Sequence, residues 1–186
     1  MSFHHASETA LAATRRWLER AVIGLNLCPF AKAVLAKQQV HFAATPADQP
    51  DAILRDFGRE LDELVALDAA ERDTTLLVIP QGMDDFLAFH ALTARAERLV
   101  RKQGLEGVVQ VASFHPRFVF AGTEEEAITN YTNRAPYPTL HLLREASIDR
   151  AVAAFPDAAA IYEANMETLR RLGRDGWDAL GMEAAP

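Results

Sequence analysis

Residues 74–80 read TTLLVIP, a short and nearly continuous apolar run. Such a run is typical of a strand that is covered on both faces. Amphipathic segments with apolar residues at helical spacing flank it, at residues 51–68 and 84–102. Strand patterns follow outside these segments, at residues 40–44 and 107–116. The order predicts a βαβαβ core, whose crossovers build a mainly parallel sheet.

The chain before this core is predicted to be helical. Apolar residues at helical spacing indicate a first helix over residues 7–22. Gly24 then interrupts the pattern, and Pro29 suits the first position of a short helix over residues 29–38. This arrangement predicts Cys28 at the N-cap of the second helix.

The chain after the core is predicted to add one strand and two helices. Tyr137 begins the segment YPTLHLLRE, which favours a strand. Ser147 is expected to cap a helix over residues 148–155, and residues 156–157 open a last helix that ends at Gly173. The predicted fold class is α/β, with a mixed, mainly parallel sheet, an N-terminal helix and C-terminal helices.

Length and composition favour one globular domain over residues 1–186, with frayed ends at 1–6 and 181–186. The net charge of −7 argues against nucleic acid as a partner. No apolar run approaches the roughly 20 residues of a transmembrane helix, so no membrane partner is expected. A single cysteine fits a reducing compartment, and we expect the cytoplasm. The sequence predicts neither a cofactor nor an oligomeric state.

One stretch, residues 113–145, concentrates side chains that can titrate, donate or ligate. Such crowding among prolines and aromatic rings is typical of a functional site. The predicted catalytic residues are His115 and His141 in this stretch and Cys28 outside it. The predicted substrate-binding residues are Arg134, Arg144, Asn130, Asn133 and Tyr137.

Each kind of candidate has its own chemistry and its own structural alternative. A helix N-cap would favour the thiolate of Cys28, whereas a buried cysteine often acts as a small hydrophobe. His115 falls at a strand end, where ligands gather in parallel sheets, although a backbone carbonyl could simply fix its ring. Arginine forks can hold a small anionic ligand or form surface ion pairs.

The spacing of His141 and Glu145 leaves a metal site open as an alternative. On a helix the two side chains share a face roughly 6 Å apart and, together with His115, could hold a metal ion. On a strand they lie about 13 Å apart, which is too far for one ion. Pro136 and Pro138 favour extended chain, so we expect a strand.

The tetrapeptide CPFA, which begins at Cys28, resembles the monothiol active site of omega-class glutathione transferases and other thioredoxin-fold proteins. This resemblance implies a reactive thiol and a cis-proline before a strand, a role that Pro138 could fill. The chain departs from that pattern, because a helix is predicted before Cys28 and an extra strand–helix–strand separates the two motifs.

Four longer segments are WLERAVIGLNLCPFAKA, TTLLVIP, VQVASFHPRFVFAG and NYTNRAPYPTLHLLREASIDRA. Together they resemble an uncharacterised bacterial family of about this length, a domain of unknown function numbered 1415. The resemblance covers nearly the whole chain and implies a single-domain protein, but it implies no activity. Five candidate residues fall within these segments: Cys28, His115, Arg134, His141 and Glu145.

Three functions stay open at this point. The first is a small enzyme that acts on a small anionic substrate through a site of cysteine, histidine and arginine. The second is a metal-dependent enzyme that uses His115, His141 and Glu145. The third is a noncatalytic binding or interaction domain, in which the proline- and aromatic-rich stretch is a docking loop.

Overall fold

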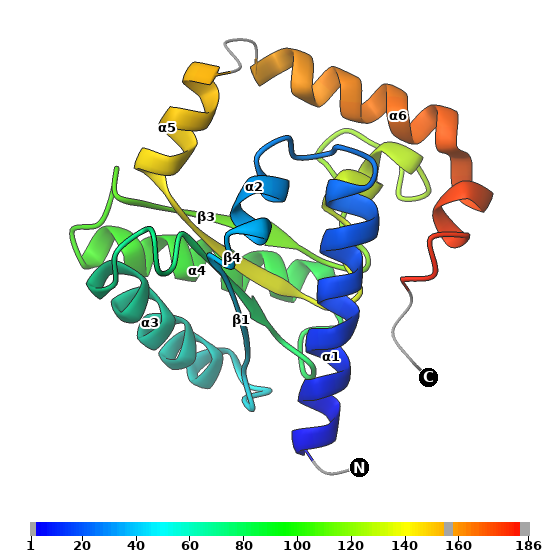
Figure 1. Cartoon of the computed structure of the whole chain (residues 1–186). Coiled ribbons are helices and arrows are strands. Elements are labelled where there is room, and N and C mark those ends of the chain that lie inside the picture. The colour runs from blue at the N-terminus through cyan, green and yellow to red at the C-terminus, as the bar shows by residue number, and fades with distance from the viewer. Residues whose placement is uncertain (1–2, 155–157, 183–186) are drawn as a thin grey trace.

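A computed structural model of the chain describes residues 3–154 and 158–182. One four-stranded sheet lies at its centre, with helices on both faces (Figure 1), so the predicted α/β class is confirmed. In chain order the elements are α1 (Phe3–Trp17), the π-helix η1 (Leu18–Ile23), α2 (Ala31–Ala36), β1 (Val40–Ala44), α3 (Pro50–Ala66), β2 (Thr74–Val78), α4 (Phe86–Lys102), β3 (Val109–Phe114), the 3-10 helix η2 (Ile128–Asn133), β4 (Thr139–Arg144), α5 (Glu145–Ala154) and α6 (Ala158–Asp178).

The strand order is β1-β2-β4-β3. β1 and β2 are parallel, whereas β4 lies between β2 and β3 and is antiparallel to both. β1, β2 and β3 therefore run in the same direction, as the βαβαβ pattern predicts, although one pairing is parallel and two are antiparallel. The insertion of β4 sets His141 opposite Leu76 on one side and Ala112 on the other.

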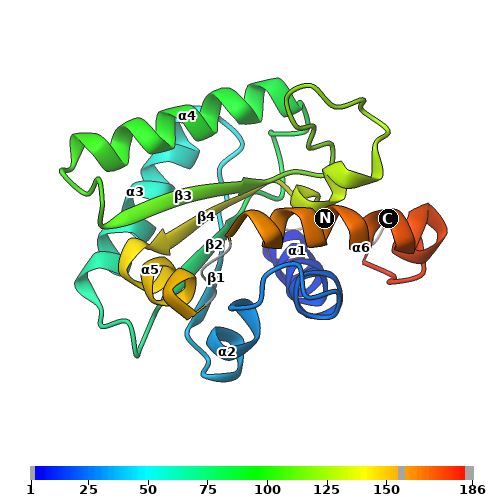
Figure 2. The same ribbon diagram turned by 90° about the horizontal axis from the view of Figure 1, so that it is seen from above.

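Helices α3 and α4 cover one face of the sheet (Figure 2). Successive side chains of a strand point to opposite faces, and on this face Leu77, Leu140 and Leu142 enter the core. They meet Ile53 and Phe57 of α3, and all five side chains are buried. Large apolar residues thus close this side of the sheet.

The opposite face carries α1, η1, α2 and α5 (Figure 2). Trp17 anchors this layer, since its ring lies 4.9 Å from that of Phe114 in an edge-on arrangement. Leu76 joins the same apolar cluster from β2, with Val40 and Phe42 of β1 packed beside it. The side chains of β1 and β2 that point away from α3 and α4 therefore pack against this helical layer.

The N-terminal helical region differs from its prediction. The helix begins at Phe3 and widens into the π-helix η1 instead of continuing as one α-helix over residues 7–22. The N–H of Gly24 donates to the carbonyl of Glu19 at 3.0 Å, which closes the wide turn. A side chain at position 24 would lie 2.2 Å from the Arg20 carbonyl oxygen, so this turn requires glycine.

The C-terminal elements confirm the predicted strand and shift the start of the helix that follows it. α5 begins at Glu145, directly after β4, so Ser147 lies inside the first turn and not at an N-cap before residue 148. The predicted helix end at Gly173 is confirmed, because its φ of 66° and ψ of 179° are not helical, and α6 consists of two helical segments that join at this kink. The predicted helix opening at 156–157 lies outside the described residues. No helix within the described ranges is both long and apolar enough to cross a membrane.

Candidate ligand-binding site

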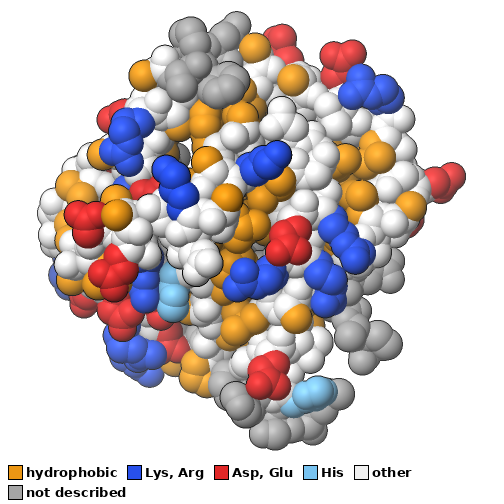
Figure 3. All heavy atoms as spheres, in the orientation of Figure 1, with side chains coloured by type: hydrophobic (Ala, Val, Ile, Leu, Met, Phe, Trp, Pro, Cys, Tyr) orange, Lys and Arg blue, Asp and Glu red, His pale blue; other side chains and the backbone are white. Residues whose placement is uncertain are grey.

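A cavity of about 310 Å³ remains between the sheet and the layer formed by α1, α2 and α5. Its walls are mainly apolar, with Trp17, Val34 and Ile148 from the helices and Leu76 and Phe114 from the strands. Figure 3 views the molecule from this side, where hydrophobic side chains reach the surface among Lys and Arg. Ligand pockets in proteins have this apolar character and begin near this size.

Strand β4 carries His141 into the cavity. Because the side chains of a strand alternate, Leu140 and Leu142 enter the core under α3 and α4, while His141 and Leu143 line the cavity. The ring of His141 lies 6.0 Å from that of Phe114. The predicted catalytic histidine is thus fixed on a rigid element and faces a hollow.

One ring nitrogen of His141 is bonded and the other is not. Nε2 lies 2.6 Å from Oγ1 of Thr74, and this hydroxyl donates to the carbonyl of Leu142 at 2.6 Å. Since the hydroxyl proton is used there, we infer that Nε2 carries a proton and donates it to Thr74. Nδ1 then keeps a lone pair that has no partner among the described residues. Burial lowers the pKa of His141 to about 4, so the ring is neutral at pH 7 and can accept a hydrogen bond.

Cys28 lines the same cavity as a free thiol. It lies in the turn between η1 and α2, where its carbonyl accepts from the N–H of Ala31 at 3.3 Å. α2 begins at Ala31 with Phe30 at its N-cap, so the predicted N-cap position of Cys28 is wrong. The chain makes a turn after Cys28 before the helix starts, so the thiol does not lie at the helix terminus.

Polar residues that the sequence pattern did not single out also border the cavity. Asp73 is buried at the start of β2, and Oγ of Ser147 donates to its carboxylate at 2.5 Å. Arg150 in turn donates to Oγ of Ser147 at 2.9 Å. The sequence did contain a signal for this polar cluster, namely polar residues at the start of an otherwise apolar strand. Buried residues such as Asp73 and Thr74 require hydrogen-bond partners, so polar side chains had to lie beside them.

His115 lies on the other side of the sheet. Its side chain is 1% exposed and packs against Phe86 and Phe89 of α4, with ring centroids 5.5 and 5.2 Å away. Nδ1 accepts from the N–H of Arg117 at 3.0 Å, and Nε2 donates to the carbonyl of Met83 at 2.9 Å. Burial lowers the pKa of His115. A backbone carbonyl thus fixes this ring, and the structure does not bring it to the cavity.

Arg144 borders the cavity, but its guanidinium is engaged elsewhere. It donates to the carbonyls of Leu64 and Leu67 at 2.5 and 2.7 Å and to that of Arg72 at 3.1 Å. The end of α3 leaves such carbonyls without helical partners, so Arg144 caps this helix from β4.

Arg134 borders a second hollow, a cleft of about 400 Å³. Its guanidinium lies 4.4 Å from the centre of the Tyr131 ring and donates to the carbonyls of Phe118 and Glu125 at 3.2 and 2.7 Å. The cleft therefore combines a cation with an aromatic face, away from the thiol and the cavity histidine.

The Arg134 cleft holds two further arginines, Arg117 and Arg174. Asp178 is the one carboxylate among its lining residues in the described part of the chain, so cations outnumber carboxylates there. Trp17 borders both the cleft and the cavity, which makes the two hollows neighbours.

The other predicted substrate-binding residues lie in the loop between β3 and β4. Asn133 donates to the carbonyl of Ser113 at 3.2 Å and so ties the loop to β3. Tyr137 precedes β4 and lines neither hollow. Asn130 is fully buried, with all its bonds inside the loop. Its partners are the N–H of Phe120, the hydroxyl of Thr123 and the carbonyls of Glu124 and Glu125.

The residues of the alternative metal site do not meet. His141 belongs to a strand and Glu145 opens the following helix, while His115 lies on the other face of the sheet. Within the residues that the structure describes, no group of three or more His, Cys, Asp or Glu side chains could hold a metal ion. His141 and Glu145 therefore do not share one face of a helix, as a metal site formed by these two residues would require.

The backbone does not support the thioredoxin-fold resemblance around Cys28. No described peptide bond is cis, so Pro138 does not supply the cis-proline of that pattern. The helices α1 and η1 precede Cys28 where the pattern requires a strand.

Comparison with known proteins identifies the family. The family model described as "Protein of unknown function (DUF1415)" matches residues 9–179, so the chain belongs to this family. No curated protein and no solved structure matches it. The family predicted from the sequence segments is confirmed, and the function has to be argued from the geometry of the sites.

Proposed function

We propose that this member of the DUF1415 family binds a small, mainly apolar molecule in the cavity under α1, α2 and α5. The observation that carries the proposal is the free Nδ1 lone pair of His141 within mainly apolar walls. Ligand sites combine apolar walls with a few polar groups that fix orientation. A ligand with an N–H or O–H group would bond Nδ1, which is otherwise a half-buried acceptor without a partner among the residues that the structure describes.

The walls of the cavity define the ligand further. A volume of about 310 Å³ corresponds to roughly ten water volumes, so the ligand has on the order of ten non-hydrogen atoms. Arg144 is the cation among the described lining residues, and main-chain carbonyls occupy its guanidinium. We therefore propose a neutral ligand in this cavity, in place of the anionic substrate that the sequence led us to expect.

Cys28 adds a nucleophile to the same cavity. In thiol enzymes an imidazole takes the thiol proton, and His141 lines the same cavity as Cys28. A ring with a pKa of about 4 is a weak base at neutral pH, which favours binding over turnover as the role of this cavity. The proposal includes a reducing, cytoplasmic setting in which Cys28 stays a thiol.

A small anion in the Arg134 cleft is the second candidate. Three arginines line that cleft, and each already has a partner: Arg134 and Arg117 donate to main-chain carbonyls, and Arg174 forms ion pairs with two carboxylates. An anion would therefore share their planar guanidinium groups, which suit a carboxylate or a phosphate. Tyr131 and Trp177 supply aromatic surface beside them, with ring centroids 5.0 Å apart. This candidate keeps the expected anionic ligand but separates it from Cys28 and His141.

One titration distinguishes the two sites. Methyl-labelled protein is titrated with small neutral donors (phenols, anilides and indole) and, separately, with small carboxylates and phosphates. We expect the neutral compounds to shift the NMR signals of Val34, Leu143 and Ile148, which line the cavity. Shifts from anions alone, confined to Ala135 and Met182 of the cleft, would favour the cleft. No shift from any neutral compound would contradict the cavity proposal.

A variant that fills the cavity makes this experiment specific. Ala151→Leu extends a side chain from α5 into the space and should weaken binding at least about tenfold, while the free energy of unfolding changes by less than about 1 kcal/mol. Ala146→Leu is the matched control, because Ala146 lies on the same helix and is exposed. Equal binding by both variants would place the ligand outside the cavity.

A further inference from the structure

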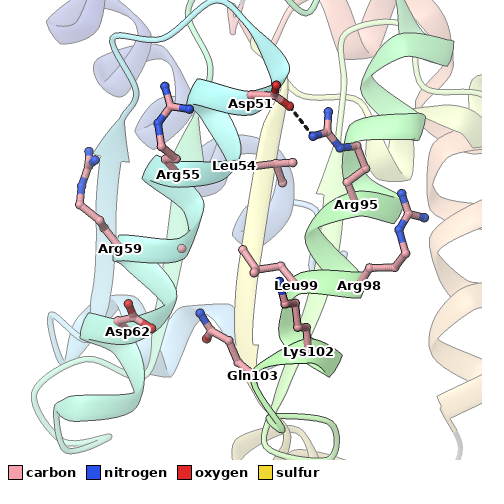
Figure 4. A pocket seen from close by; sticks show the side chains of 11 residues that line it. Asp51, Leu54, Arg55, Arg59, Asp62, Arg95, Arg98, Leu99, Lys102 and Gln103 are labelled. Atoms are coloured by element: carbon pink, nitrogen blue, oxygen red, sulfur yellow. Dashed lines mark hydrogen bonds and ion pairs between the residues drawn. The ribbon is translucent and has the colours of Figure 1, made fainter.

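A groove of about 540 Å³ lies between α3 and α4. These two helices cover the face of the sheet that is turned away from the cavity (Figure 2). Leu54 and Leu99 point toward one another between the two helices and form an apolar floor (Figure 4). Gly58 adds no side chain to this floor, and a Cβ there would make an ordinary van der Waals contact, 3.6 Å from a Leu99 methyl carbon.

Helical spacing produces two charged walls. Arg55 and Arg59 lie four residues apart on α3, and Arg95, Arg98 and Lys102 lie at intervals of three and four on α4. Each set therefore occupies one face of its helix, on either side of the apolar floor (Figure 4). From residue 51 to residue 62 the α3 wall is about 16 Å long.

The groove is electropositive although the chain is acidic. Five cations line it against two carboxylates, Asp51 and Asp62, whereas the whole chain has a net charge of −7. Two of these cations form ion pairs, Arg95 with Asp51 at 2.5 Å and Arg59 with Asp56 at 2.7 Å. The other three, Arg55, Arg98 and Lys102, have no ion-pair partner in the described part of the chain.

We propose that this groove docks an acidic amphipathic helix of a partner protein. Apolar side chains of that helix would cover Leu54 and Leu99, and its carboxylates would meet Arg55, Arg98 and Lys102. Helix-in-groove recognition uses this combination of an apolar stripe and charged flanks. The inference concerns a surface on the opposite side of the sheet and does not depend on the cavity ligand.

The charge order of the groove favours a peptide over a nucleic acid. Asp51 and Asp62 stand at the two ends of the α3 wall, so a uniformly charged phosphate backbone would meet a carboxylate at each end. An acidic helix can instead place its carboxylates between them. A symmetric dimer through this surface would set the cations of one copy against those of the other, so we do not assign the groove to self-association.

The proposal is tested with a fluorescein-labelled helical peptide of about 14 residues that carries leucine on one face and glutamate on both flanks. Fluorescence anisotropy with the full chain should show binding that weakens at least about tenfold when salt rises from about 50 to about 500 mM. The double variant Arg98→Glu, Lys102→Glu should weaken binding by at least about the same factor.

The control variant is Arg170→Glu, Arg171→Glu, which makes the same charge change on exposed residues of α6 and should leave affinity within about twofold. Circular dichroism checks that both variants fold. Equal binding of a peptide with glutamine for glutamate, or no binding up to about 1 mM, would overturn the proposal. Tighter binding of an oligothymidylate of equal charge, or a peptide-independent dimer in sedimentation, would overturn it as well.

Discussion

Each face of the sheet packs against a histidine ring, and these two rings differ in how many of their nitrogens are hydrogen-bonded to the protein. Under α3 and α4, both ring nitrogens of His115 are bonded to the backbone and two phenylalanine rings pack against it. Under α1, α2 and α5, His141 uses one nitrogen with Thr74 and turns the other toward a cavity. Burial lowers the pKa of both rings, so each is neutral at pH 7.

The difference shows that burial and titration do not identify a functional histidine here. His115 has no bonding capacity left for a ligand, whereas His141 keeps an acceptor and space beside it. The two faces differ in how completely side chains fill the space between sheet and helices. Large side chains fill it under α3 and α4, whereas small residues such as Ala31, Ala112 and Ala151 surround the cavity on the other face.

The largest expected effect comes from two neighbouring leucines that face opposite sides. Leu142→Ala should lower the free energy of unfolding by about 3–5 kcal/mol, because Leu142 is fully buried in the core under α3 and α4. Leu143→Ala should cost less than about 2 kcal/mol, because its side chain already borders a cavity and has fewer neighbours to lose. Urea denaturation measures both. Equal losses would mean that the two faces are packed alike.

The next effect in size is the acid sensitivity caused by His141. The folded protein holds this ring neutral down to a pKa of about 4, whereas the unfolded chain takes up a proton near pH 6.5. The unfolded state therefore binds more protons between these values, so stability is full above about pH 6.5 and falls by up to about 3 kcal/mol as the pH approaches 4. His141→Asn should flatten this slope in urea denaturation measured across pH.

Part of the slope should persist in that variant, because burial also lowers the pKa of His41 and of His115. His90→Asn is the matched control for the removal of one histidine, since His90 is exposed on α4. A slope as flat as that of His141→Asn would show that the effect is not specific to His141. A slope that is the same in His141→Asn and in the unsubstituted protein would contradict the neutral, desolvated state of His141.

Periodicity predicted most of the fold because each element carries its own signal. The strand at Val40–Ala44 matches its predicted limits, and the helices at Pro50–Ala66 and Phe86–Lys102 lie within two residues of theirs. The place of β4 between β2 and β3 was not predictable in this way, because pairing between distant strands leaves no local pattern. The start of α5 shifted for a local reason, since Glu145 continues from β4 without a turn.

The candidate site was predicted less well, because its residues were selected by type. Strand alternation separates His115 from the cavity, since it shares parity with Val109 and Val111, which point toward α4. That signal was present in the sequence. The partners of Arg144 were not, because they are main-chain carbonyls of residues such as Leu64, 80 positions away. A polar side chain looks the same in a sequence whether it holds the backbone or a ligand.

The smallest expected effect tests the comparison of the two histidines directly. At about pH 7.5, His115→Gln should lose one of two backbone hydrogen bonds and lower the free energy of unfolding by about 1–2 kcal/mol, with cavity binding unchanged within about twofold. His141→Leu should cost less than about 1 kcal/mol but weaken binding of the neutral donors at least about tenfold, because leucine has no acceptor for the ligand. Urea denaturation and the NMR titration measure the two quantities on the same samples. If His115→Gln instead abolishes binding and leaves stability unchanged, then the closed face carries the function and its bonded ring must open to reach a ligand.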